Sequence, residues 1–131
     1  MKKVFVILSL LIVSFFALKA YAKGLTFPEA YGQISRKPMA ILVYADWADN
    51  YQGYILSFRR LQQTPIAKNF NFVELDIKSK ETKFFNDKYK ISTKLPYVML
   101  LRNDGKVSRH VTRECLSESS CVISKMKAFI L

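Results

Sequence analysis

The chain has few of the residues from which catalytic and metal centres are built. Its 131 residues include one histidine, His110, and two cysteines, Cys115 and Cys121. A single histidine excludes a metal site built from several histidines. No Ser-His-Asp set, glycine-rich phosphate loop or usefully spaced carboxylate pair is recognisable either. We therefore expect neither a metal nor any other cofactor.

Residues and segments that interrupt helices and strands are also scarce. There are only four glycines and four prolines, and no internal repeat, low-complexity tract or interdomain linker is present. A chain of this length without such breaks is typical of one domain. It is long enough to bury a hydrophobic core without help from a metal or from many disulfides.

Residues 1–22 have the organisation of a secretory signal peptide. Two lysines form a basic start, residues 4–18 are almost entirely apolar, and Ala20-Tyr21-Ala22 is an A-x-A cleavage site. The apolar stretch is short for a membrane span, and an uncleaved anchor is the alternative. The pattern is typical of bacterial export. We expect cleavage near Ala22 and a periplasmic or secreted domain of residues 23–131.

Positive charge exceeds negative charge in this domain. The formal net charge of the whole chain is +11, and it falls to +8 without the three lysines of residues 1–22. A basic exported protein can bind an acidic partner or, weakly, an anionic membrane surface. The alternative is a solvated surface that keeps the protein soluble. The lysines are scattered and the compartment is unfavourable, so no nucleic acid is expected as a partner.

The first half of the domain alternates between helical and extended patterns. Thr26-Phe27-Pro28-Glu29 is a capping box with proline in the first turn, and it predicts a short helix ending before residue 37. Residues 39–44 form a continuous apolar run, which is typical of a central strand covered on both faces. A helix capped by Asp49 or Asn50 then extends to about residue 63.

The second half continues this alternation and ends in a hairpin. A strand is predicted over residues 71–77 and a helix from Ser79 to about residue 90. Strands at 97–102 and 106–113 flank an Asn-Asp-Gly turn, and Ser117 caps the last helix. The order α-β-α-β-α-β-β-α predicts an α/β fold with a central mixed four-stranded sheet and helices on both faces.

Two motifs in this order resemble those of the thioredoxin-like family. Tyr44-Ala45-Asp46-Trp47 follows the apolar strand and precedes a helix, and Leu95-Pro96 lies before the next strand of the hairpin. Members of the family carry a cis proline at the second position, opposite the active site. The resemblance covers nearly all of residues 23–131, is closest to periplasmic members, and implies a thioredoxin-like fold.

The chain departs from this family at the residues that carry its chemistry. The two cysteines of the Cys-x-x-Cys motif correspond to Ala48 and Tyr51, and a buried proton-moving aspartate corresponds to Leu42. In the family, the helix N-terminus lowers the pKa of the first cysteine and stabilises its thiolate. Neither replacement can act as this nucleophile. The resemblance therefore implies a redox-inactive protein without catalytic residues.

The binding function of the family does not require these cysteines. Members hold an extended polypeptide by β-strand addition at the edge next to the cis proline. The corresponding peptide-binding residues here are Trp47, Asp49, Asn50, Tyr51, Leu95, Pro96 and Tyr97. The expected partner is an envelope polypeptide, or a component of a secretion or assembly system, bound in a chaperone-like or scaffold role. The alternative is that these residues only maintain the fold. If the edge binds a partner, Tyr97→Asp weakens binding without unfolding the domain.

Cys115 and Cys121 support a competing function. An even number of neighbouring cysteines in an oxidising compartment predicts a disulfide. Thioredoxin-like topology implies that Cys115 lies in a loop beside the proline bend, with Cys121 in the first turn of the last helix. A structural bridge is the leading interpretation. A relocated redox pair, which would make the protein a thiol-disulfide oxidoreductase, and two separate thiols are the alternatives. The sequence predicts neither the partner's identity nor an oligomeric state.

Overall fold

The computed structural model describes residues 23–92 and 94–131, so the predicted signal peptide lies outside the described residues. In chain order the elements are α2 (Phe27–Tyr31), β1 (Met39–Tyr44), α3 (Tyr51–Arg60), the 3₁₀ helices η1 (Leu61–Gln63) and η2 (Pro65–Asn69), β2 (Asn71–Asp76), α4 (Glu81–Tyr89), β3 (Tyr97–Arg102), β4 (Val107–Val111), α5 (Arg113–Leu116) and α6 (Ser119–Ile130). Within the described ranges, no helix combines the length and apolar character needed to cross a membrane.

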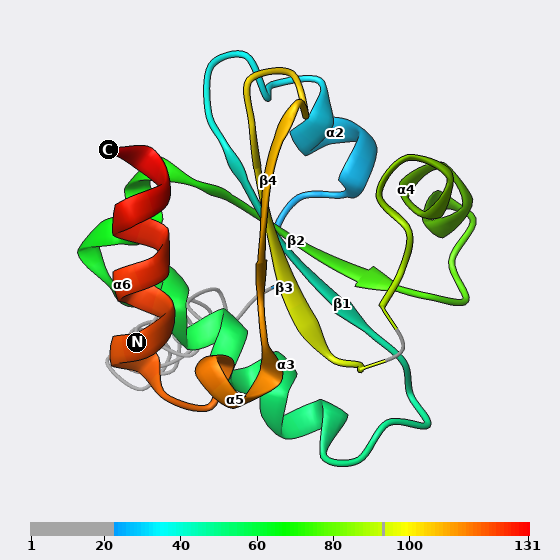
Figure 1. Cartoon of the computed structure of the whole chain (residues 1–131). Helices are drawn as coiled ribbons and strands as arrows, with labels where there is room; N and C mark the ends of the chain where they lie inside the picture. Colours follow the sequence, from blue (N-terminus) through cyan, green and yellow to red (C-terminus); the bar gives the residue numbers. More distant parts are fainter. Residues whose placement is uncertain (1–22, 93) are drawn as a thin grey trace, which may run out of the picture.

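The four strands form one mixed sheet in the order β2-β1-β3-β4 (Figure 1). β1 is parallel to β2 and antiparallel to β3, and β3 is antiparallel to β4. The parallel pair requires a crossover, which α3, η1 and η2 supply, whereas the antiparallel pair β3-β4 needs only a tight turn. The predicted α/β class and mixed four-stranded sheet are confirmed.

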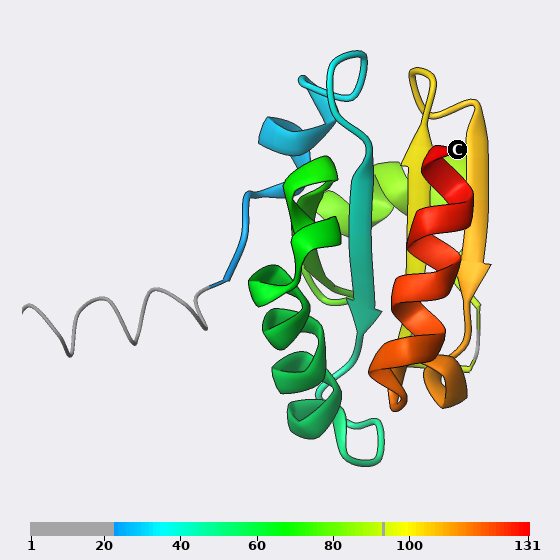
Figure 2. The same cartoon turned by 90° about the vertical axis from the view of Figure 1, so that its left-hand side faces the viewer.

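Helices cover both faces of this sheet, as predicted (Figure 2). α2 and α4 pack on one face, where they contribute Phe27 and Phe85, and α3, α5 and α6 pack on the other. Alternate residues of β1 point into the two cores, so that Ile41 belongs to the first and Leu42 to the second. Because both faces of β1 are buried, its sequence is a continuous apolar run.

The strand directions gather the connecting segments at two opposite ends of the sheet. β1, β2 and β4 end, and β3 begins, at the same end. This end therefore carries residues 45–50, the Leu95–Pro96 bend and α5 (Figure 1). The loop before β1, the β3-β4 turn and the last turn of α6 lie at the other end. Two separate surfaces are thus available on one small domain.

The predicted elements are present, and the largest local correction concerns the chain after β4. This strand ends at Val111 instead of continuing to residue 113, and the Thr112 side chain accepts a hydrogen bond from the Cys115 amide to begin α5. Cys115 therefore lies in a short helix and not in a loop. The last helix begins at Ser119 with Glu118 as its N-cap, so the expectation that Ser117 caps it is wrong.

Candidate functional site

The segment between β1 and α3 is a series of tight turns. The Ala48 amide donates to the Ala45 carbonyl at 3.2 Å, and the Tyr51 amide donates to the Ala48 carbonyl at 3.3 Å. Asn50 is the N-cap of α3 in the left-handed region, with φ of 55°, which asparagine adopts more readily than most residues. Its side chain makes no capping hydrogen bond. Positions 48 and 51 therefore lie at the tip of the first long helix.

The side chains of this tip differ in accessibility. Trp47 is 64% exposed, and Asp49 and Asn50 are also exposed. Ala48 is half-buried against the core beneath α2 and α4. Tyr51 is half-buried too, since its ring stacks on that of Tyr44 with centroids 6.3 Å apart and planes 3° from parallel. Trp47 is thus the projecting aromatic group, and Tyr51 covers the end of β1.

An ion pair joins this segment to the loop that follows β2. Lys78 Nζ lies 2.8 Å from a carboxylate oxygen of Asp46, and this hydrogen bond raises the pKa of Lys78. Both groups are well exposed, so the pair contributes little to stability. The pair links the residue before Trp47 to the loop that follows the neighbouring strand.

The Leu95–Pro96 bend lies at the same end of the sheet, at the start of β3. Its peptide bond is cis. Arg113 Nη1 of α5 donates to the Leu95 carbonyl at 3.4 Å, so the short helix after β4 lies directly against the bend. The side chains of Leu95 and Pro96 are buried. This half of the predicted peptide-binding edge therefore offers no exposed side chain to a partner.

Tyr97 does not fit the role that the sequence suggested for its side chain. It is fully buried, its hydroxyl accepts a hydrogen bond from the Ser92 amide at 3.3 Å, and burial raises its pKa. Its ring centroid is 4.4 Å from that of His110. Tyr97→Asp would bury a carboxylate in this position, which is costly. We therefore expect this substitution to destabilise the fold, contrary to the prediction from sequence.

A buried carboxylate does occur beside Leu42, but on the neighbouring strand. Leu42 pairs in register with Glu74, whose side chain is 1% exposed. Arg59 of α3 donates to the two carboxylate oxygens of Glu74 through Nε at 2.7 Å and Nη2 at 2.8 Å. Such a two-pronged pair gives both carboxylate oxygens a charge-assisted hydrogen bond. It is suited to joining helix and sheet and not to moving protons.

Sequence reasoning missed this pair. Val73 and Leu75 occupy one face of β2 and Glu74 the other, a pattern typical of a half-exposed strand. Both faces are covered, and Glu74 tolerates burial because Arg59 neutralises it. An acid between the apolar residues of β2, with an arginine on the preceding helix, was the available signal.

The two cysteines form a disulfide, as predicted. The Cys115–Cys121 S–S distance is 2.08 Å and the Cα atoms are 5.3 Å apart. The bridge joins α5 to the third residue of α6. It therefore holds the helix whose Arg113 contacts the Leu95 carbonyl. Within residues 23–92 and 94–131 no free cysteine remains, and no cluster of His, Cys, Asp and Glu could hold a metal ion.

The tip of α3 thus offers groups for binding and carries no thiol. An exposed indole, the Asp49 carboxylate and the Asn50 amide surround positions 48 and 51, which carry a methyl group and a phenol. Aromatic and polar groups of this kind suit non-covalent recognition of another molecule. No sulfur is present at this tip.

Comparison with solved structures shows the thioredoxin fold, whereas no protein-family model and no curated protein matches the chain. Mitochondrial thioredoxin 3 of Saccharomyces cerevisiae, in its oxidized form, is 16% identical with a TM-score of 0.59, covering 84% of this chain and 96% of that one. The thioredoxin of Malassezia sympodialis is 14% identical with a TM-score of 0.62, covering 81% and 91%. Trxlp of Edwardsiella tarda is 20% identical with a TM-score of 0.58, covering 76% and 89%. The likeness confirms the thioredoxin-like fold.

Proposed function

We propose that this thioredoxin-fold chain is an exported, redox-inactive protein that binds another polypeptide at the tip of α3. The observation that carries the proposal is the make-up of this tip. Ala48 and Tyr51 stand where the family has its two cysteines, and the neighbouring Trp47 is 64% exposed. The tip keeps the accessibility that a thioredoxin needs for its substrates, and it has lost the sulfur that would react with them.

Trp47 is the expected anchor of the bound partner. A large exposed aromatic side chain costs solubility unless something covers it, and tryptophan is enriched among residues that dominate binding energy. The turn hydrogen bonds of Ala48 and Tyr51, together with the Asp46–Lys78 pair, hold its backbone in place. An anchor that is ordered before binding loses less conformational entropy on association.

The Leu95 carbonyl is the expected main-chain contact. It accepts a long hydrogen bond of 3.4 Å from Arg113. A carbonyl oxygen has two lone pairs and can accept a second bond. An extended segment of the partner could therefore pair here while its side chains pack on Trp47. Specificity would come from the exposed groups of residues 47–51, because the side chains of the bend are buried.

Crosslinking in the native envelope, followed by mass spectrometry of the captured partner, tests this function. Trp47→Ala is compared with Phe84→Ala, which removes another half-exposed aromatic ring on α4, away from the tip. We expect Trp47→Ala to reduce recovery of a specific polypeptide about tenfold, as for the loss of a binding hot spot. Recovery should be unchanged in Phe84→Ala. Equal recovery by the two variants would contradict binding at this tip.

Thiol-disulfide oxidoreduction through Cys115 and Cys121 is the second candidate. It is favoured by the position of Cys121 in the first turn of α6, where the helix dipole stabilises a thiolate. Against it, the Cys-x₅-Cys spacing matches no established redox motif. A bridge that resists mild reductant would argue for a structural disulfide, since catalytic disulfides have more oxidising potentials.

The proposed function also requires that the protein is exported. Residues 1–22 would direct the chain to the periplasm or outside, where the disulfide is stable. N-terminal sequencing of the protein recovered from the envelope should find Lys23 as the first residue. A mature protein that begins at Met1 in the membrane fraction would show that the segment is kept as an anchor.

A further inference from the structure

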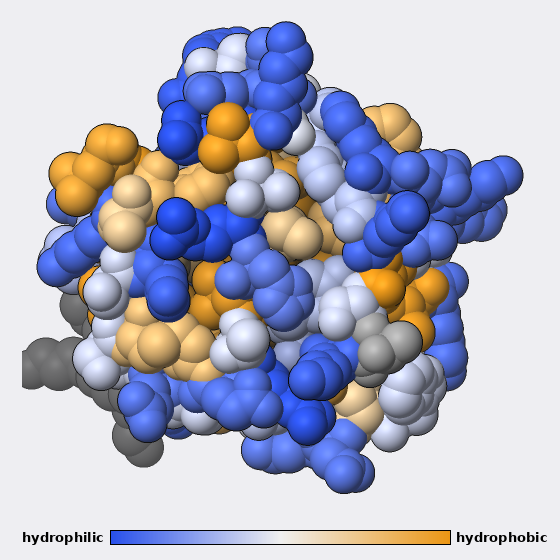
Figure 3. Space-filling view, viewed as in Figure 1, coloured by the Kyte–Doolittle hydropathy of each residue, from blue (hydrophilic) through white to orange (hydrophobic). Residues whose placement is uncertain are grey.

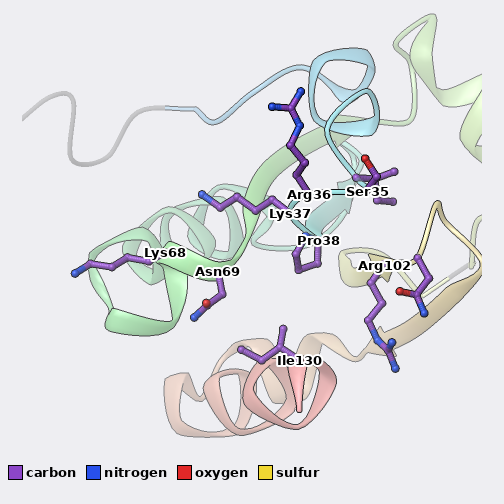
Figure 4. A pocket seen from close by; sticks show the side chains of 10 residues that line it. Ser35, Arg36, Lys37, Pro38, Lys68, Asn69, Arg102 and Ile130 are labelled. Carbon is purple, nitrogen blue, oxygen red and sulfur yellow. The ribbon is translucent and has the colours of Figure 1, made fainter.

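A second candidate site lies at the end of the sheet opposite the tip of α3. It is a cavity of about 490 Å³ between the loop before β1, η2, the end of β3 and the last turn of α6 (Figure 4). This volume lies within the range of small-molecule sites in proteins. The cavity shares no residue with the proposed polypeptide site, and its function is independent of that proposal.

The residues that line this cavity are strongly biased in charge. Four are cationic, namely Arg36, Lys37, Lys68 and Arg102, and none is acidic. Asn69 and Asn103 add amide donors. The nearest acid along the chain, Asp104, lies in the adjoining turn and is not a lining residue. On a domain that carries acids elsewhere on its surface, this concentration of positive charge favours an anionic ligand.

Arg102 gives a second, independent indication. It is half-buried at the end of β3, and its guanidinium lies over the Phe129 ring, 5.2 Å from the centroid. Its Nε atom is buried and has no hydrogen-bond partner among the described residues. A buried donor of a charged group normally has a partner. In Arg59, by contrast, Nε and Nη2 each donate a hydrogen bond to a carboxylate oxygen of Glu74.

The arrangement of the cations limits the kind of anion. In Figure 4 the charged ends of Arg36, Lys37, Lys68 and Arg102 point away from the middle of the cavity and in different directions. A single small ion cannot contact them all. A ligand with several anionic groups can, because lysine and arginine side chains are long and flexible, and the arginine fork matches phosphate oxygens.

We propose that this cavity binds a ligand carrying two or more phosphate groups. The phosphates contact Arg102 and Lys37 near the base of the cavity and Arg36 and Lys68 at its rim. A soluble polyphosphorylated compound and the headgroup of an anionic phospholipid share this chemistry.

Lipid contact through the face of the domain seen in Figure 3 would not rest on apolar burial. On the face seen in Figure 3, apolar side chains lie in separate groups between hydrophilic ones. Binding to a vesicle would therefore depend on charge and weaken with salt. Binding to a soluble polyphosphate would also weaken with salt, but it would saturate at one ligand per chain.

Isothermal titration calorimetry of the exported chain with tripolyphosphate tests the site, with inorganic phosphate as the single-group comparison. Arg36→Gln combined with Lys68→Gln removes two exposed cations of the rim. Lys83→Gln combined with Lys94→Gln is the matched control, because these exposed lysines lie outside the cavity and the net charge is the same. Arg102→Gln is measured separately, with a thermal melt to check folding.

We expect one tripolyphosphate site, weaker binding of phosphate, at least a tenfold loss in the rim variant and no loss in the control. Cosedimentation with vesicles containing cardiolipin, an anionic phospholipid with two phosphate groups, distinguishes the two sources. Saturable vesicle binding that is lost in the rim variant, with no binding of tripolyphosphate, would identify a headgroup as the ligand. Equal losses in the rim and control variants, or no saturable binding to any probe, would overturn the proposal.

Discussion

The pair of Arg59 and Glu74 shows, at the scale of single residues, why an acid can lie inside this sheet. The Glu74 side chain is 1% exposed and that of Arg59 is 31% exposed. The arginine therefore reaches from solvent to the carboxylate along the face of α3. Two guanidinium donors bind the oxygens of this carboxylate next to the apolar Leu42.

Removal of the Arg59 side chain should therefore lower the free energy of unfolding. Arg59→Leu leaves the Glu74 carboxylate buried without its partner, and we expect a loss of about 3 kcal/mol in the free energy of unfolding. The double variant Arg59→Leu with Glu74→Leu should recover most of this loss, because it removes the buried charge as well. Urea unfolding of the three proteins measures both effects. Equal stability of Arg59→Leu and the wild type would contradict the assigned role of the pair.

His110 gives a prediction about pH. Partial burial beside Tyr97 lowers the pKa of His110, so the folded state binds a proton less readily than the unfolded state, whose pKa is about 6.5. Well above about pH 6.5 the histidine is neutral in both the folded and the unfolded state. Its titration then has no effect on the free energy of unfolding. As the pH falls below this value the unfolded chain gains a proton first, and stability decreases.

His110→Gln should therefore flatten the decrease in unfolding free energy between about pH 7.5 and about pH 5. Urea unfolding at several pH values measures the slope of each protein. Glu29 and Glu114, whose pKa values are lowered, titrate below this window and are common to both proteins. Parallel slopes for the variant and the wild type would contradict the assignment.

At the scale of elements, the disulfide holds α5 against the start of β3. It joins Cys115 in α5 to Cys121 in α6, while Arg113 of α5 contacts the Leu95 carbonyl. The bridge closes a loop of seven residues. A loop of this length restricts the unfolded chain modestly, and stabilises the folded domain by about 2 kcal/mol in the chain-entropy picture.

Replacing both cysteines by serine should lower the unfolding free energy by about 2 kcal/mol and leave the domain folded. Reductant should then destabilise the wild type by the same amount and have no effect on the variant, as measured by urea unfolding. A variant that fails to fold at all would show that the bridge does more than restrict this loop.

Most elements could be predicted from sequence because their signals are local. The capping box of Thr26 and Glu29 is formed as expected, and the continuous apolar run became the central strand. α5 was missed because four residues carry no helical period, although Thr112 was an available N-cap signal. The predicted strand therefore extended to residue 113, the first residue of α5.

The candidate site was harder to predict, because accessibility depends on tertiary packing. The sequence located Trp47 and the Leu95–Pro96 bend in their relative order, but it could not show that Tyr97 points into the core. Arg102 is a similar case. A charged residue at a strand end is usually exposed, and only its packing against Phe129 of α6 reveals a buried donor.

At the scale of the whole molecule, the sheet separates two surfaces. One end carries the exposed Trp47 and the disulfide-held helix α5, and the other carries the cationic cavity. The strand directions create both, because they bring loops distant in sequence to each end. The proposed polypeptide site and the proposed phosphate site therefore lie at opposite ends of the sheet.

The central claim, that the fold persists here without its nucleophile, is tested most directly by insulin reduction in the presence of a thiol reductant. Three proteins are compared, namely the wild type, Cys115→Ala, and a double variant that combines Ala48→Cys with Tyr51→Cys. We predict no turnover above background by the wild type and clear turnover by the double variant, in which a thiol pair is restored at the tip of α3. Turnover by the wild type that disappears in Cys115→Ala would contradict the account.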